Sequence, residues 1–209
     1  MKILMLVLSA ACAYLIAGIN PAIILSNKIY HKDIRECGSK NPGFTNFKRC
    51  FGMKWASVVM ILDLVKSALP TVVFGVLFGK LFNMYQLGVV YTCFFAMLGH
   101  AYPVWYRLKG GKGFLVCLAS MWVLDWKIGA IATLLMIVLL AITRYMSLST
   151  MLAMASCPVT LAVIGYESLW AEIICILCVV FMIYRHKGNI VRLVKREESK
   201  FSFKSKKQE

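Results

Sequence analysis

Three clusters of small, polar and basic residues have the chemistry to bind phosphate. The first covers residues 38–49 and reads Gly-Ser-Lys-Asn-Pro-Gly-Phe-Thr-Asn-Phe-Lys-Arg. Glycine frees the backbone to present N–H groups, and Pro42 stiffens the turn. Hydroxyls and side-chain amides can donate to oxyanions, and Arg can clamp a phosphate through two hydrogen bonds. A hydrophilic membrane loop would have a similar composition, so both interpretations stay open. The candidate ligands are Ser39, Asn41, Thr45, Asn46 and Arg49.

The second cluster is the Lys-Gly-Gly-Lys-Gly stretch that ends residues 99–113. Backbone nests combined with a Lys form phosphate cradles in other folds. The stretch is not a P-loop, because the spacing differs and neither Ser nor Thr follows Lys112. A basic turn fixed by membrane topology would explain the lysines, but it would not explain three glycines around Lys112. The candidate ligands are Lys109, Gly110, Gly111 and Lys112.

The third cluster, residues 185–193, reads Arg-His-Lys-Gly-Asn-Ile-Val-Arg-Leu and continues to Glu198. His186 and Asn189 are three residues apart, so they share one face of a helix. A basic tail is usually a lipid-facing anchor, and a lone His is more often structural. The segment nevertheless adds His186 and Asn189 to the candidates.

Two smaller patterns lie at or within apolar segments. Asp63 and Lys66 are three residues apart inside an apolar helix. Burying a charge in such a helix costs free energy, so a charged residue there suggests a functional role. A mutually neutralised structural pair is an equally good interpretation. Arg144 and Ser147 stand at the boundary of another apolar run and are further phosphate-binding candidates.

The elements that must position these residues are membrane helices. The sequence is 60% hydrophobic and 16% charged, against about 45–50% and about 25% in soluble domains. Because lipid cannot satisfy backbone polar groups, such apolar runs are expected to be helical. We predict an all-α integral membrane protein with about seven transmembrane helices, forming one polytopic domain over residues 1–209 with a basic tail from about 186. The apolar runs are 3–25, 55–78, 87–105, 114–124, 128–142, 148–164 and 169–184.

Charge predicts the orientation of these spans. The formal net charge is +15. With the N-terminus outside, the inside segments hold seven, three, one and nine Lys or Arg residues, which is 20 of the 24. Positively charged loops are retained in the cytoplasm, so the C-terminus is predicted to be cytoplasmic. Nucleic-acid binding is disfavoured because the charge does not form one contiguous soluble face.

The eight cysteines do not predict a metal centre. Most lie in apolar runs, where Cys behaves as a small hydrophobe. Cys175 and Cys178 are spaced like a redox or metal pair, but no second pair is nearby, so packing is the favoured interpretation. Cys37 and Cys50 lie in a loop and can be reactive, although nothing in the sequence pairs them with a base.

In these motifs the sequence resembles the PlsY family of acyl-phosphate:glycerol-3-phosphate acyltransferases. Residues 38–49 match the family's Gly-Ser-Gly-Asn-Pro-Gly-Ala-Thr-Asn-x-x-Arg except at Lys40 and Phe44. Residues 99–113 match its second motif with two aromatic exchanges, and His186 to Glu198 match the third except at Arg196. The family's Asp-x-x-Lys and Arg-Tyr-x-Ser also appear, and the resemblance covers the whole chain.

The resemblance implies transfer of a fatty acyl group from acyl phosphate to the sn-1 hydroxyl of glycerol 3-phosphate, giving 1-acylglycerol 3-phosphate and phosphate, the first step of bacterial phospholipid synthesis. It implies a multi-pass protein of the bacterial inner membrane, without metal or cofactor, linked functionally to an enzyme that makes acyl phosphate. Ser39, His186 and Asn189 become candidates to orient the hydroxyl or to hold the oxyanion. The alternatives are a non-catalytic paralogue, because of Lys40 and Phe44, and an organic-phosphate transporter, although no internal repeat is present.

Overall fold

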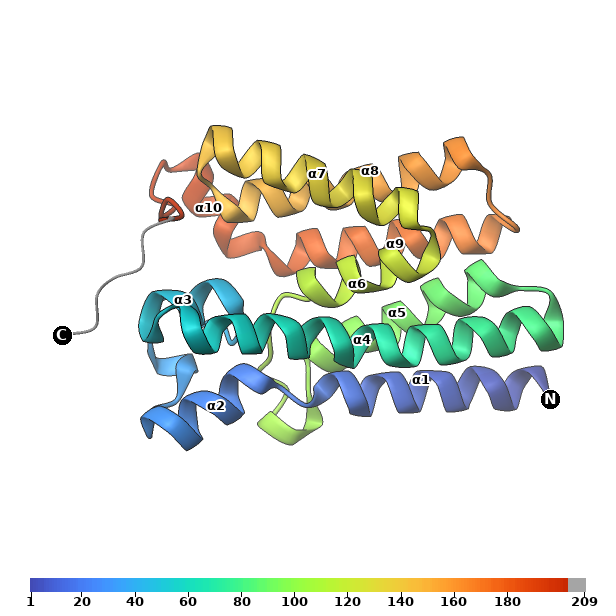
Figure 1. The fold of residues 1–209 in the computed structure, drawn as a ribbon, viewed down its shortest axis with the longest axis horizontal. Coiled ribbons are helices and arrows are strands. Elements are labelled where there is room, and N and C mark those ends of the chain that lie inside the picture. The colour runs from blue at the N-terminus through green and yellow to red at the C-terminus, as the bar shows by residue number, and fades with distance from the viewer. Residues whose placement is uncertain (203–209) are drawn as a thin grey trace.

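The computed structural model describes residues 1–202 of the chain, and every regular element within them is a helix. The long helices lie side by side in a bundle (Figure 1). In chain order the elements are α1 (Lys2–Gly18), α2 (Pro21–Tyr30), η1 (Ile34–Glu36), α3 (Phe44–Phe51), α4 (Met53–Phe82), α5 (Tyr85–Ala101), η2 (Val104–Tyr106), α6 (Phe114–Leu124), α7 (Trp126–Thr143), α8 (Met146–Ile164), α9 (Leu169–Arg185) and α10 (Lys187–Val194).

The short helices α2, α3 and α10 gather at one end of the bundle, on the left of Figure 1. The N-terminus of α1 and the connections α4–α5 and α8–α9 lie at the opposite end. This arrangement brings the first and third candidate clusters, which are far apart in sequence, to the same end of the molecule.

Five helical segments are long and apolar enough to cross a membrane, and α9 with α10 makes a sixth if this pair, bent by 59°, is one broken span. The 11 residues of α6 extend only about 16 Å, roughly half of a hydrocarbon core about 30 Å thick. The predicted membrane-helix architecture is therefore confirmed at five or six spans, whereas a seventh span and the orientation stay predictions. The five segments are Lys2–Tyr30, Met53–Phe82, Tyr85–Tyr106, Trp126–Thr143 and Met146–Ile164.

The first predicted helix, 3–25, is interrupted. Asn20 has an extended backbone and its side chain accepts a hydrogen bond from the Ile23 N–H at 3.1 Å, which caps α2. Pro21 occupies the first turn, where its missing N–H costs nothing. The predicted loop 26–54 was also wrong in part, because α2 continues to Tyr30 and α3 forms within that loop.

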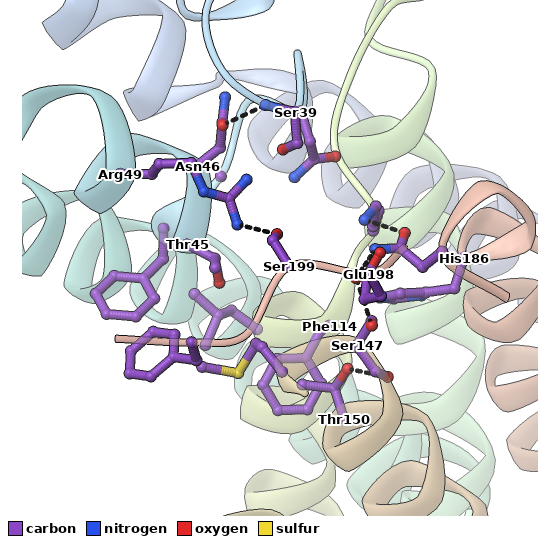
Figure 2. A pocket seen from close by; sticks show the side chains of 18 of the residues that line it. Ser39, Thr45, Asn46, Arg49, Phe114, Ser147, Thr150, His186, Glu198 and Ser199 are labelled. Atoms are coloured by element: carbon purple, nitrogen blue, oxygen red, sulfur yellow. Dashed lines mark hydrogen bonds between the residues drawn. The ribbon is translucent and has the colours of Figure 1, made fainter. Parts of the chain in front are cut away.

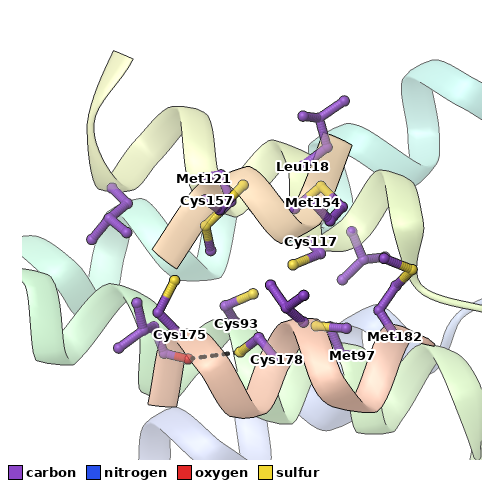
Figure 3. Close-up of a cluster of buried hydrophobic side chains, with 14 of the residues drawn as sticks. Cys93, Met97, Cys117, Leu118, Met121, Met154, Cys157, Cys175, Cys178 and Met182 are labelled. Atoms are coloured by element: carbon purple, nitrogen blue, oxygen red, sulfur yellow. Dashed lines mark hydrogen bonds between the residues drawn. The ribbon is translucent and has the colours of Figure 1, made fainter. Parts of the chain in front are cut away.

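Sulfur-containing side chains fill much of the core between α5, α6, α8 and α9 (Figure 3). Cys175 and Cys178 are fully buried there, which fits their interpretation as packing residues. No group of three or more His, Cys, Asp or Glu side chains suited to a metal ion occurs within residues 1–202. The labelled core residues are Cys93, Met97, Cys117, Leu118, Met121, Met154, Cys157, Cys175, Cys178 and Met182.

Candidate active site

A cavity of about 700 Å³ opens at the end of the bundle where α3 and α10 meet the loops. One wall is polar and comes from the 38–49 loop, α3 and the third motif (Figure 2). The other wall is apolar and comes from α4, α6 and α7. The cavity could therefore accept an anionic group against its polar wall and a hydrocarbon chain against its apolar wall. Its apolar lining includes Met60, Phe114, Leu115, Met136, Ile137 and Leu140.

Nine of the thirteen candidate residues line this cavity, although they come from four separate segments of the chain. They are Ser39, Asn41, Thr45, Asn46, Arg49, Lys112, Ser147, His186 and Asn189. The structure does not bring the other four, Lys109, Gly110, Gly111 and Arg144, to the cavity lining.

The buried Asn46 organises the first loop from inside. Its side-chain oxygen accepts the Ser39 N–H at 2.8 Å, and its amide donates to the carbonyls of Ile34 and Cys37 at 3.3 and 2.9 Å. Because its side-chain oxygen and its NH₂ group both bond to the backbone, Asn46 shapes the loop and does not offer its full donor capacity to a ligand. The sequence had suggested direct phosphate binding.

Cys37 and Cys50, which the sequence suggested as reactive thiols, are joined by a disulfide. The bond connects the residue before the loop to the last turn of α3, with the two Cα atoms 6.4 Å apart. This part of the loop is therefore closed covalently as well as through Asn46. The spacing of two cysteines in a loop did not reveal their pairing.

Lys112 belongs to the polar wall. Its ammonium donates to the side-chain oxygen of Asn189. Burial lowers the pKa of Lys112 to about 8, while the nearby carboxylate of Glu198 acts in the opposite direction. Neighbouring Arg192, Arg185 and Arg49 also lower this pKa, so the cavity concentrates positive charge around one ammonium.

Glu198 accepts hydrogen bonds from three neighbouring side chains, among them Asn189, the partner of Lys112. Ser147, Asn189 and Arg192 donate to its carboxylate at 2.7, 2.6 and 2.7 Å. Burial by itself would raise the pKa of Glu198, but these hydrogen bonds outweigh it and hold the pKa below its usual value. Glu198 was not among the candidate ligands, although its place in the third motif was a signal. It fixes Asn189, which in turn meets Lys112.

The buried His186 sits at the bend between α9 and α10. Its Nδ1 lies 2.9 Å from the carbonyl oxygen of Met182. Because a carbonyl can only accept, Nδ1 carries the proton of the neutral ring, and Nε2 is left as an acceptor. His186 can thus accept a hydrogen bond from a hydroxyl in the cavity.

Gly110 and Gly111 act through their backbones, behind the cavity wall. Their N–H groups donate to the carbonyls of Ala101 and His100 at 3.1 and 3.0 Å, and Arg185 donates to both of their carbonyls. The two N–H groups, which the sequence suggested as phosphate ligands, are thus already bonded within the protein. They fix the path of the chain into Lys112 instead.

The remaining two candidates are exposed cations. The side chain of Lys109 is exposed on the same loop. Arg144 ends α7 in a left-handed conformation with φ 59°, and its side chain is exposed as well. Ser147, predicted together with Arg144, is buried because it lies a turn further along, inside α8.

The buried pair Asp63 and Lys66 supports the second motif. The Lys66 ammonium is 2.8 Å from the Asp63 carboxylate, 3.0 Å from Nδ1 of His100 and 2.8 Å from the carbonyl of Ile19. His100 in turn packs against Gly111, where even a Cβ would come within 2.1 Å of its Nε2. The pair thus links α1 and α4 to the loop that carries Lys112. Asp63 and His100 also reach the cavity lining.

A helical bundle of membrane-crossing length, with a cavity that is polar on one side and apolar on the other, has the features expected of an integral membrane protein with a site for an amphiphilic molecule. Residues 7–196 match the family model described as glycerol-3-phosphate acyltransferase. The chain belongs to this family, and it is therefore an acyltransferase of phospholipid biosynthesis.

Similar proteins support this membership. The chain is 34% identical over 194 residues to the glycerol-3-phosphate acyltransferase of Francisella tularensis subsp. tularensis (strain FSC 198), covering 93% of this chain and 92% of the relative. It is 31% identical to the enzyme of Legionella pneumophila (strain Corby), covering 91% and 67%. The crystal structure of PlsY, an integral membrane glycerol 3-phosphate acyltransferase, in its glycerol 3-phosphate form superposes with a TM-score of 0.86 at 29% identity, covering 94% of this chain and 96% of that one. The lysophosphatidic acid form gives a TM-score of 0.83 at 28% identity, with 94% and 95% coverage.

Proposed function

We propose that this enzyme transfers a fatty acyl group from acyl phosphate to the sn-1 hydroxyl of glycerol 3-phosphate, giving 1-acylglycerol 3-phosphate and inorganic phosphate. The observation that carries the proposal is a cavity in which a polar wall with Lys112 and Arg49 faces an apolar wall. An acyl phosphate has the same two-part character, since it joins a hydrocarbon chain to a dianionic headgroup. Glycerol 3-phosphate brings a second phosphate and a nucleophilic hydroxyl.

Positive charge is what this reaction needs most from the protein, because its two substrates repel each other. Lys112 and Arg49 approach the cavity from different segments and can each hold a phosphate. Where water is partly excluded, as at the half-buried Lys112, one well-placed donor is worth roughly 3–4 kcal/mol. Arg49 is exposed, so solvent screens its charge and it contributes less. Asn41 and Thr45 add neutral donors on the same wall.

Direct transfer is favoured over an acyl-enzyme. Within the described residues, no base is hydrogen-bonded to the Ser39 hydroxyl, so Ser39 lacks the activation that a nucleophilic serine needs. In the direct step the sn-1 oxygen bonds to the acyl carbon, the bond from that carbon to the phosphate oxygen breaks, and phosphate leaves with the hydroxyl proton. His186, through Nε2, orients the hydroxyl, and Ser39 donates to the carbonyl oxygen. Because the donor is already activated, positioning supplies much of the acceleration.

We place the cavity at the cytoplasmic side of a bacterial inner membrane. Most Lys and Arg residues belong to segments at the cavity end, and positive loops stay in the cytoplasm. The donor then comes from a separate acyl-phosphate-forming enzyme on that side. Single thiols introduced in place of Lys109 and Asn83, in a cysteine-free background, test the orientation. A membrane-impermeant reagent should label position 83 from outside in intact cells and leave position 109 unlabelled, and the reverse pattern would invert the topology.

The activity is tested with purified protein, palmitoyl phosphate and glycerol 3-phosphate. We expect phosphate release to match the formation of lysophosphatidic acid, and NMR of the product to show acylation at sn-1. Palmitoyl-coenzyme A should not replace the acyl phosphate. Transfer from the thioester but not from the acyl phosphate would contradict the proposed donor while leaving the family assignment intact.

A further inference from the structure

The chain beyond Glu198 crosses the mouth of the cavity. The family model ends at residue 196, so residues 199–202, here called the strap, lie outside the matched region. In Figure 2 the strap leaves Glu198, passes Ser199 and continues towards the side of the cavity that carries Thr45 and Arg49. Ser199 and Phe201 both line the cavity.

The strap is attached on both sides of this mouth. On one side the Phe201 N–H donates to the carbonyl of Arg144, at the α7–α8 turn, at 2.6 Å. On the other side the ammonium of Lys48, in α3, donates to the carbonyl of Ser202 at 2.6 Å and lies 4.1 Å from the centre of the Phe201 ring. These contacts bridge α3 and the α7–α8 turn across the polar opening.

The strap also contacts a candidate phosphate ligand. The Arg49 guanidinium donates to the hydroxyl of Ser199 at 2.8 Å (Figure 2). Arg has five N–H donors, so one contact with a neutral hydroxyl orients the group and leaves other donors for a phosphate. Two substrates with several negative charges enter this opening, whereas water must be kept from an activated acyl donor.

We propose that the strap determines which acceptor is acylated: Ser199 positions Arg49 for the phosphate of glycerol 3-phosphate, and Phe201 closes the mouth so that this hydroxyl, rather than water, reaches the acyl phosphate. The inference rests on the proposed acyl-phosphate donor. In the side reaction a water oxygen bonds to the acyl carbon, the bond to the phosphate oxygen breaks, and free fatty acid and phosphate are released. Ser199 and Phe201 are positioning residues in this scheme.

The test compares two truncations of the same terminus. One ends after Ser202 and keeps the strap; the other ends after Glu198 and removes it. Phe201→Ala and Ser199→Ala, in the unmodified chain, separate closure from the orientation of Arg49. For each protein the KM for glycerol 3-phosphate and the ratio of fatty acid to lysophosphatidic acid are measured with palmitoyl phosphate, and glycerol 3-phosphate binding is measured without donor.

We expect the truncation after Ser202 to behave like the unmodified protein. Removal of the strap should raise the KM and the dissociation constant for glycerol 3-phosphate by about fivefold or more, as expected for a loosened charge-assisted contact. It should also raise the fatty-acid ratio by about threefold or more, because water gains access. Ser199→Ala should reproduce mainly the affinity loss, and Phe201→Ala mainly the hydrolysis.

An unchanged KM and an unchanged product ratio after removal of the strap would overturn the inference. A higher rate of transfer would overturn it too, because the segment would then obstruct the site. If the truncation after Glu198 does not fold, Phe201→Ala and Ser199→Ala decide by the same two measurements. If the unmodified protein does not use palmitoyl phosphate, the proposed donor fails, while glycerol 3-phosphate binding by the same set still tests the strap.

Discussion

The two glycine-containing loops at the cavity are held in opposite ways. The first loop, residues 38–43, is held by side chains of α3, the helix that follows it: the amide of Asn46 bonds to the loop backbone, and the disulfide between Cys37 and Cys50 closes the loop. The second loop, residues 109–113, is held through the backbone of Gly110 and Gly111, which binds α5 on one side and Arg185 on the other.

The way each loop is held determines which substitutions it can accept. In the first loop Lys40 adopts φ 59° with its side chain exposed, so a large residue fits where the family motif has Gly. In the second loop a Cβ on Gly110 would lie 2.0 Å from the carbonyl oxygen of His100, and a Cβ on Gly111 would lie 2.1 Å from the His100 ring. The first loop thus accepts a large residue at position 40, although a Cβ on Gly38, where φ is 56°, would clash with the side-chain oxygen of Asn46. In the second loop both Gly110 and Gly111 are tightly packed.

The largest effect is expected for Gly111→Ala, which should abolish transfer and lower thermal stability. His100 cannot move away easily, because its ring is buried and bonded to Lys66, and overpacking of such a site costs about 1–3 kcal/mol or more. The matched change in the first loop is Gly43→Ala, where φ is −159° and a Cβ would meet only the Asn41 amide at 3.2 Å. It should keep the melting temperature within a few degrees and retain measurable transfer. Equal losses in the two variants would erase the contrast between the loops.

Lys112→Ala should abolish acyl transfer without loss of membrane insertion. It removes the ammonium that Asn189 and Glu198 surround, and loss of one preorganised donor typically costs about 10²–10³ in kcat. The control is Lys109→Ala, which removes an exposed cation three residues away and should change transfer by less than about twofold. Turnover and gel-filtration profile are measured for both. Near-normal turnover by well-folded Lys112→Ala would remove this residue from the site.

The pH dependence of acyl transfer should report the protonation state of Lys112. Lys112 must be charged to hold a phosphate, and its folded pKa of about 8 means that the charge is present below that pH and lost above it. We therefore expect kcat/KM for glycerol 3-phosphate to fall as pH rises through about 8. Because bound phosphate favours the ammonium, the fall in kcat should come at a higher pH. Lys112→Arg, if active, should lose this inflection, since Arg does not titrate there; an unchanged profile would assign the inflection elsewhere.

A smaller effect is expected from opening the disulfide of the first loop. Asn46 still bonds Ser39 N–H and the carbonyl of Cys37 when the sulfurs are apart. Reduction, or the variant Cys50→Ser, should therefore change transfer by less than about twofold, whereas Asn46→Ala should lower it by about tenfold, consistent with leaving several buried polar groups unpaired. If the loop faces the cytoplasm, alkylation in intact cells should find both thiols reduced. A larger effect of Cys50→Ser than of Asn46→Ala would show that the covalent bond, and not the amide, shapes the loop.

The sequence predicted membrane helices and the residues of the cavity better than it predicted how those residues are held. Apolar runs reveal spans because lipid forces helices, and motif residues such as Lys112 and His186 differ in kind from their surroundings. The partners of Asn46, the role of Gly111 as a packing surface for His100 and the return of Phe201 to the cavity all depend on tertiary contacts. No periodicity encodes them, since the residues that meet lie far apart in the chain.

The smallest effect is expected at Lys40, where the first loop departs from the family motif. The left-handed backbone at φ 59° costs a residue other than Gly about 1–2 kcal/mol, so Lys40→Gly relieves strain. The same change also increases the freedom of the unfolded chain, which offsets part of this gain. The net change in stability should therefore be below about 1 kcal/mol.

Function at Lys40 should respond through charge. Lys40 lines the cavity, its side chain is exposed, and both proposed substrates are anions. Lys40→Gly should raise the KM for glycerol 3-phosphate by about threefold or less, with the difference shrinking as salt is added, because an exposed cation is screened. The kcat should stay within about twofold, since Ser39, Thr45 and Arg49 keep their places along the same wall. Transfer is measured for both proteins across glycerol 3-phosphate and salt concentrations. If the wild type is inactive and Lys40→Gly is active, then Lys40 disables the first loop, and the tolerance inferred from the comparison of the two loops is wrong.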